Sequence, residues 1–143
     1  RRVIAVINGL NSSKDRSQEA ERLIDWSFRE FNNYKIYNKN TEVYKAPIWL
    51  GTEEFVPVIL NDDIKLTLSD EEYRNLKVKV KYSKPISAPI KKGKEIGFLH
   101  ILVNNKQIDK RPLFSAKDID ELSLFGKVKM KLEYILFGEI IGK

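Results

Sequence analysis

The sequence predicts a mainly β protein with α elements: a strand and a helix, then a small two-sheet β-sandwich, then a C-terminal amphipathic helix. Short runs rich in β-branched residues, split by Pro, Gly and Asp, recur between Glu42 and Phe114. One sequence motif occurs twice within that region, and apolar residues at helical spacing lie on both sides of it. We therefore expect the end of a larger domain at 1–33, a linker at 34–41, an all-β domain at 42–121 and a helix at 122–143.

The N-terminal part combines one expected strand with one expected helix. Residues 1–7 read RRVIAVI, and such an apolar, β-branched run favours a strand buried on both faces. A helix is expected from about Asp15 to Phe31, where Asp15 and Gln18 fit a capping box. Its buried face is predicted to comprise Ala20, Leu23, Ile24, Ser27, Phe28 and Phe31. One strand and one helix cannot bury a core alone. We therefore expect residues 1–31 to pack on a second copy, as a fragment dimer, or to dock on a surface that they would not touch in the longer protein.

The central region is predicted to be a series of short strands. Asn32 to Asn40 is polar and turn-rich, which favours a linker. The strict alternation in Lys77 to Lys81 indicates a strand with one wet face, and Asn104-Asn105 marks a hairpin turn. Ser69 and Glu72 fit the cap of a single helical turn. The expected strands are Tyr44 to Leu50, Glu54 to Leu60, Ile64 to Leu68, Leu76 to Lys81, Ile86 to Ala88, Lys94 to Val103, and Gln107 to Phe114.

An internal repeat organises this β region. Residues 46–53 and 88–95 share the pattern A-P-I-x-x-G-x-E. Further on, Pro57-Val58-Ile59 and Pro112-Leu113-Phe114 each precede an Asp-Ile pair at the same spacing. Neither copy could bury its apolar face alone, so each half is predicted to supply one sheet of the sandwich.

The C-terminal segment is the strongest candidate for a functional element. Its apolar residues gather on roughly half of a helix, with Lys127, Lys131 and Tyr134 on the other side. Burying lysines in a bilayer would cost on the order of 2.5–3.5 kcal/mol each, which argues against a spanning helix. A helix lying in the membrane interface and a helix docked on protein remain open alternatives. The candidate membrane-anchor residues are Leu124, Phe125, Val128, Leu132, Ile135, Leu136, Ile140, Lys127 and Lys131.

The residues themselves indicate no catalytic, cofactor or metal site. The chain has 143 residues and no cysteine, and its net charge of +6 favours anionic partners without choosing among them. No serine is followed by lysine three residues later, so the acyl-serine motif S-x-x-K is missing, as are S-x-N and K-T-G. His100, the only histidine, lies in an apolar run and is expected to be a strand residue. The lysines are scattered and the aromatics lie in apolar contexts, which argues against a nucleic-acid surface.

In their order along the chain, these pieces resemble the C-terminal part of a low-molecular-mass penicillin-binding protein, a serine-type D-alanyl-D-alanine carboxypeptidase. The resemblance covers essentially the whole chain, and the ordered combination is more specific than any single piece. It rests on Arg1 to Gly9 (RRVIAVING), the E-A-x-x-L-I-x-W-x-F-R-x-F pattern ending at Phe31, Ile48 to Gly51, Ala88 to Ile90, Gly97, Arg111 to Leu113, and Phe125 to Lys127.

The resemblance implies a division of labour within a longer protein. Residues 1–33 would end a penicillin-recognising α/β domain, whose catalytic motifs lie upstream and cleave D-alanine from peptidoglycan stem peptides. The all-β domain would be a stalk or platform, and the terminal helix would anchor it to the periplasmic face of the bacterial cytoplasmic membrane. No catalytic residue carries over to this chain, so it is expected to be inactive alone. The alternative is a stand-alone β-sandwich interaction module whose helix docks on a protein partner.

Overall fold

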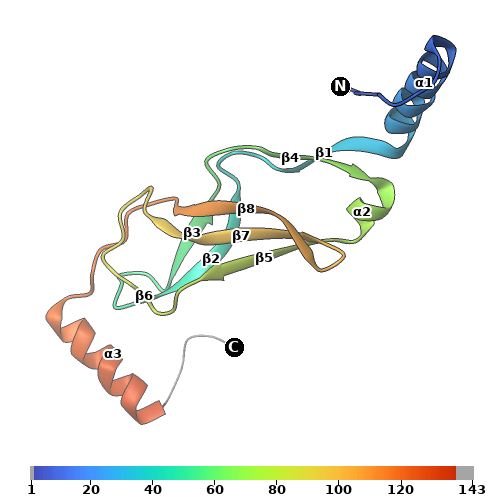
Figure 1. Cartoon of the computed structure of the whole chain (residues 1–143). Coiled ribbons are helices and arrows are strands. Elements are labelled where there is room, and N and C mark those ends of the chain that lie inside the picture. The colour runs from blue at the N-terminus through green and yellow to red at the C-terminus, as the bar shows by residue number, and fades with distance from the viewer. Residues whose placement is uncertain (1, 138–143) are drawn as a thin grey trace.

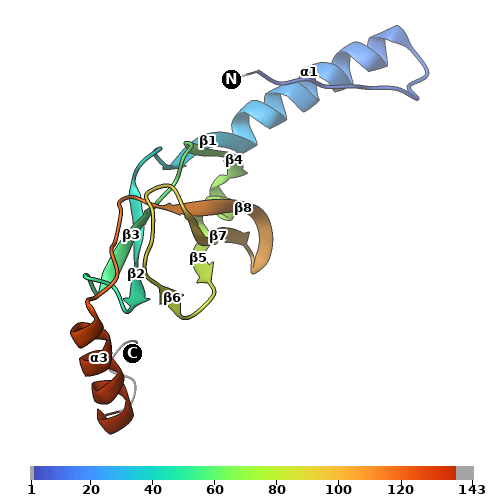
Figure 2. The ribbon, with the colours of Figure 1, turned by 90° about the vertical axis from the view of Figure 1, so that its left-hand side faces the viewer.

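The computed structural model describes residues 2–137, except the side chains of Lys127, Met130, Glu133 and Phe137. One helix lies at each end of a central β region, and the views in Figures 1 and 2 agree that both project away from it. The elements in chain order are α1 (Ser13–Glu30), β1 (Phe31–Tyr37), β2 (Glu42–Trp49), β3 (Phe55–Ile59), β4 (Ile64–Ser69), α2 (Asp70–Arg74), β5 (Leu76–Tyr82), β6 (Ile86–Ser87), β7 (Glu95–Val103), β8 (Lys106–Ser115) and α3 (Leu124–Phe137).

The main body is one six-stranded sheet in the order β5-β7-β8-β3-β2-β6, which curls around its own core. A mainly β fold is therefore confirmed, but the expectation that each repeat copy forms its own sheet is wrong. β3 of the first copy pairs with β8 of the second, so both copies share one sheet. The core joins side chains from both copies: Ala46, Ile48, Val56, Val58, Leu60, Ile64, Ile86, Ala88, Ile90, Leu99, Ile101, Leu113 and Ile119.

The two motif copies lie next to each other at one end of this sheet. β2 pairs in parallel with β6, and the Ala88 backbone N–H donates to the Trp49 carbonyl at 3.0 Å. The isoleucine of each motif, Ile48 or Ile90, is at most 1% exposed. The repeat therefore marks equivalent core positions, because each copy presents its Ala and Ile to the same interior.

The expected strands of the β region are present, with ends shifted by one or two residues. The β7–β8 hairpin turns at Asn104 and Asn105, whose φ angles of 51° and 64° are those of a two-residue primed turn. On β5, Lys77, Lys79 and Lys81 are exposed while the residues between them pack on the core. The alternation of lysines with apolar residues in the sequence therefore correctly predicted which side chains of β5 face solvent and which face the core.

A small second sheet lies where the linker was expected. β1 pairs with β4 in antiparallel register from Phe31 opposite Ser69 to Tyr37 opposite Ile64. Much of β1 is exposed, which explains why its polar composition suggested a linker. Tyr34 stacks on Tyr73 of α2, with ring centroids 3.9 Å apart. The predicted cap of α2 is confirmed, since Ser69 and Glu72 form a reciprocal capping box.

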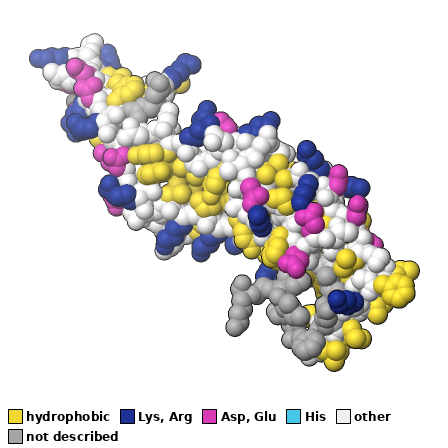
Figure 3. Space-filling view, turned by 180° about the vertical axis from the view of Figure 1, so that it is seen from behind, with side chains coloured by type: hydrophobic (Ala, Val, Ile, Leu, Met, Phe, Trp, Pro, Cys, Tyr) yellow, Lys and Arg dark blue, Asp and Glu magenta, His cyan; other side chains and the backbone are white. Residues whose placement is uncertain are grey.

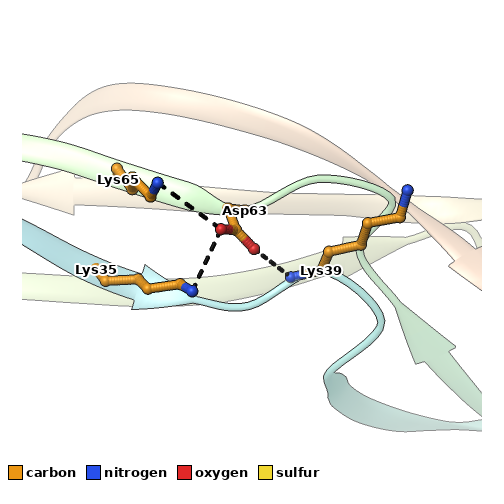
Figure 4. A network of polar contacts seen from close by, with 4 residues as sticks. All are labelled: Lys35, Lys39, Asp63 and Lys65. Atoms are coloured by element: carbon orange, nitrogen blue, oxygen red, sulfur yellow. Dashed lines mark hydrogen bonds and ion pairs between the residues drawn. The ribbon is translucent and has the colours of Figure 1, made fainter.

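Asp63 ties the end of β1 to the start of β4 (Figure 4). Its carboxylate accepts a hydrogen bond from the Lys39 backbone N–H at 2.9 Å and lies 3.2 Å from Lys35 Nζ and 3.9 Å from Lys65 Nζ. The Lys39 hydrogen bond, followed by the one from Lys35, holds the pKa of Asp63 below its usual value of 3.8. A lowered pKa means that folding favours the charged carboxylate.

This linkage predicts a pH-dependent contribution to stability. Because the folded-state pKa of Asp63 is lowered, its stabilisation is present above the unfolded-state pKa and disappears as pH falls through the folded-state pKa. We expect Asp63→Asn to lower the urea midpoint at pH 7, with a difference from the unmodified chain that shrinks below about pH 4. Asp62→Asn is the control, since Asp62 takes part in no ion pair or side-chain hydrogen bond that the described residues show. A difference that stays constant down to pH 2.5 would contradict the assignment.

The N-terminal segment differs from its prediction in three ways. Residues 2–10 form no strand and pair with no described strand, and Ile4 and Val6 are exposed. Helix α1 is capped by Ser12, whose side chain accepts from the Asp15 N–H at 3.1 Å, so the capping box at Asp15 is wrong. No residue of α1 is buried, and among the other described helices and strands only β1 makes appreciable contact with it. Packing of residues 1–31 on a second copy stays a prediction, which sedimentation velocity would check.

Candidate functional site

The candidate site is α3, whose apolar side chains face away from the β region. Phe125 is 91% exposed, Leu124 81% and Ile135 77%. Figure 3 shows hydrophobic side chains gathered over this end of the molecule. Moving such a side chain completely from water into an apolar environment is favourable by roughly 1.5–3 kcal/mol. The predicted apolar residues that the structure describes are all exposed together here: Leu124, Phe125, Val128, Leu132, Ile135 and Leu136.

The other predicted site residues are only partly placed. Lys131 is exposed on the same helix, as is Lys129. The Lys127 backbone lies in the first turns of α3, but its side chain is outside the described part of the chain, as is Ile140. Within residues 2–137, no helix is long and apolar enough to cross a membrane. Helix α3 has 14 described residues, or about 21 Å of length.

Backbone hydrogen bonds fix the point where α3 leaves the body. The Leu122 N–H donates to the Leu50 carbonyl, and the Thr52 N–H donates to the Asp120 carbonyl, each at 2.9 Å. Ile119 exchanges two hydrogen bonds with Ile90, at 2.8 and 2.9 Å. The segment entering α3 is therefore tied to both copies of the repeat. This attachment makes the start of the helix part of the folded β region.

An aromatic contact sets which side of α3 faces the body. Tyr134 packs on the half-buried Trp49 at the end of β2, with ring centroids 5.4 Å apart. The sequence placed Tyr134 opposite the apolar residues, and the structure agrees, since its ring faces the β region. The contact between Trp49 and α3 was not predicted, because residue spacing within one segment gives no information about contacts with a segment far away in the sequence. With Tyr134 turned inward, the apolar side chains face solvent.

Two of the polar side chains elsewhere, His100 and Asp70, have structural partners. His100 is a strand residue, as expected, and its Nδ1 lies within hydrogen-bond distance of Gln107 Oε1. Asp70 accepts from Tyr34 Oη at 2.5 Å and from Asn32 Nδ2 at 3.2 Å, and the Tyr34 bond, followed by the Asn32 bond, lowers the Asp70 pKa. Among the described residues, no group of three or more His, Cys, Asp or Glu could hold a metal ion. The His100–Gln107 contact thus joins β7 to β8, and the hydrogen bonds of Asp70 tie α2 to β1.

Comparisons with known proteins agree on one family. The model described as "Penicillin-binding protein 5, C-terminal domain" matches residues 31–121. The D-alanyl-D-alanine carboxypeptidase DacC of Escherichia coli is 28% identical over 128 residues, covering 89% of this chain and 32% of that protein. The D-alanyl-D-alanine carboxypeptidase DacF of Bacillus subtilis is 28% identical over 119 residues, covering 82% and 31%. The chain thus spans about a third of the length of these curated relatives.

Solved structures share the fold. Penicillin binding protein 5 from Haemophilus influenzae superposes with a TM-score of 0.65 at 23% identity, over 77% of this chain and 32% of that one. The D-alanyl-D-alanine carboxypeptidase DacD from Francisella tularensis gives a TM-score of 0.65 at 22% identity, over 80% and 29%. The family model begins at β1, so the strand that the sequence suggested as linker belongs to the shared domain.

Proposed function

Since this chain belongs to the family of penicillin-binding protein 5 C-terminal domains, we propose that it is the stalk and membrane anchor of a serine-type D-alanyl-D-alanine carboxypeptidase. In this proposal the parent protein trims peptidoglycan stem peptides at the periplasmic face of the cytoplasmic membrane. The names of the relatives support the enzyme class. This chain contains none of the S-x-x-K, S-x-N and K-T-G motifs, so we expect no acylation by a labelled penicillin.

The observation that carries the anchor proposal is the exposed apolar face of α3. Helix α3 is held by its N-terminal attachment and by the Trp49–Tyr134 contact, which leave Leu132 and Ile135 free to enter an apolar environment. A lipid interface would cover that face, while lysines nearby could contact anionic headgroups.

Vesicle flotation of the full chain tests the proposal. Leu132→Ser/Ile135→Ser removes two apolar side chains from the helix face without changing the charge. We expect it to weaken partitioning into vesicles that contain anionic lipid by roughly a hundredfold, if each side chain is fully buried in lipid. The matched control is Phe55→Ser/Ile108→Ser, which removes two apolar side chains that are 45% and 44% exposed elsewhere in the chain.

The control should float like the unmodified chain. Equal flotation by all three proteins would contradict the anchor. If none of them floats, a helix that docks on a protein partner becomes the better interpretation.

A further inference from the structure

Four lysines lie on the outer face of three adjacent strands, three of them on β5 and one on β8, with β7 between these two strands (Figure 1). Antiparallel register sets Lys79 opposite His100, and His100 opposite Lys110. Lys77 and Lys81 lie two residues to either side of Lys79, and alternate strand residues share a face. All four lysines are exposed. We call the surface formed by Lys77, Lys79, Lys81, Phe98, His100 and Lys110 the cationic face.

The charge of the cationic face is not neutralised by the described part of the chain. None of its lysines takes part in an ion pair there. Lys77 Nζ donates to the Asn105 side-chain oxygen at 3.2 Å, and Lys110 Nζ lies 3.7 Å from the centre of the Phe98 ring. Lys79 and Lys110 are each opposite His100, so β7 separates them, but the four like charges share one face with no described carboxylate in ion-pair contact. A bound polyanion would supply the missing negative charge.

Protection of a sheet edge explains only part of this arrangement. β5 is an edge strand, and lysines on an edge discourage pairing with another chain. β7 and β8 are interior strands of the same sheet, so no edge needs protection there. Lys110 nevertheless extends the positive charge across the full width of the three strands. Edge protection therefore does not explain Lys110, which is on the interior strand β8.

The shape of the cationic face suits an extended polymer. Successive lysines on β5 are spaced by about 7 Å, which gives a regular row of charges. An open hollow of about 410 Å³ lies at one end, and its lining includes Lys81, Glu95, Phe98 and His100. The half-buried Phe98 ring adds apolar surface next to the lysines, with the Lys110 ammonium over its face. An open row of this kind can bind a chain of repeated anionic units.

We propose that the cationic face binds peptidoglycan, a glycan whose stem peptides carry repeated carboxylates. The stalk would then contact the wall polymer directly. The choice of peptidoglycan rests on the proposed function, whereas the charge arrangement does not depend on it. Binding would be electrostatic and would weaken with salt, because exposed ion pairs are screened.

Co-sedimentation of the full chain with purified insoluble peptidoglycan tests this proposal. Lys79→Gln/Lys81→Gln/Lys110→Gln should weaken binding by about tenfold, since three exposed ion pairs are lost. The matched control is Lys91→Gln/Lys92→Gln/Lys94→Gln, which removes the same charge from exposed lysines in the turn before β7. The control should change binding less than about twofold. Binding by the unmodified chain should also fall between 50 and 300 mM salt, by about the same factor.

Equal losses in the two variants, or salt-independent binding by the unmodified chain, would overturn the proposal. Vesicle flotation in parallel separates it from the anchor. A chain that floats without sedimenting with peptidoglycan overturns wall binding alone, and one that sediments without floating overturns the anchor alone. If the cationic-face variant fails only on anionic vesicles and no peptidoglycan binding occurs, the face is a lipid contact and the proposal is wrong.

Discussion

Replacing Gly97 with alanine is expected to lower the free energy of unfolding by roughly 3 kcal/mol or more. A Cβ at this position would lie 2.4 Å from the Lys81 carbonyl oxygen and 2.7 Å from Tyr82 Cβ. The Lys81 carbonyl belongs to the backbone of β5, so relief requires that β5 move away from β7. We expect the urea midpoint to fall markedly, with loss of amide protection along β5.

Gly93→Ala is the matched control for this prediction. Gly93 has a φ of +81° and nothing within 4 Å of a Cβ, so its substitution carries conformational strain without a clash. We expect a cost of about 1–2 kcal/mol there. If Gly97→Ala is no more destabilising than Gly93→Ala, the close approach of β5 and β7 is not what requires glycine.

Replacing Ile90 with alanine is expected to destabilise the chain by about 2–5 kcal/mol. Ile90 is fully buried, and its backbone bonds to Ile119 hold the segment that leads into α3. Ile48 occupies the equivalent place in the first motif copy and is 1% exposed, so Ile48→Ala should cost a similar amount. Equilibrium urea unfolding of both variants gives the comparison.

Ile90→Val is the conservative control, with an expected cost of about 0.5–1.5 kcal/mol. A cost below 1 kcal/mol for Ile90→Ala would contradict a core built from both motif copies. A large cost at Ile90 with none at Ile48 would contradict their equivalence.

Local patterns in the sequence predicted the strands of the β region well. Alternation located β5 and its exposed lysines, and Asn104-Asn105 located the β7–β8 turn. These features are encoded by neighbouring residues. Pairing between distant strands is not, so the union of both motif copies in one curled sheet could not be predicted from their likeness alone.

The errors at the N-terminal end also have a physical cause. Val3 to Ile7 has strand composition, but a strand needs a partner, and none of the described strands pairs with it. For β1 the error is the reverse, because a segment without strand composition forms a strand. Its polar residues Asn32 and Asn33 suggested a linker, yet β1 pairs with β4 along one edge of its backbone.

At the candidate site, the sequence predicted the apolar face of α3 but not its orientation. Helical spacing alone grouped Leu132 and Ile135, and both side chains are exposed in the structure. Which side of the helix faces the body depends on Trp49, and on the backbone bonds that tie Leu122 to Leu50. Those contacts join residues far apart in sequence, so only the folded chain reveals them.

Spin labels on opposite sides of α3 test the central claim most directly. The sequence has no cysteine, so Leu132→Cys and Lys127→Cys each give a single labelling site in the full chain and keep the Trp49–Tyr134 contact. Position 127 is seven residues before Tyr134, so helical spacing places it on the same side of α3. With the protein bound to anionic vesicles, the label at 132 should be accessible to oxygen and shielded from a water-soluble nickel complex. The label at 127 should remain accessible to the nickel complex. Equal exposure of both labels to the nickel complex in the vesicle-bound chain would contradict an α3 that lies in the membrane interface on its apolar face.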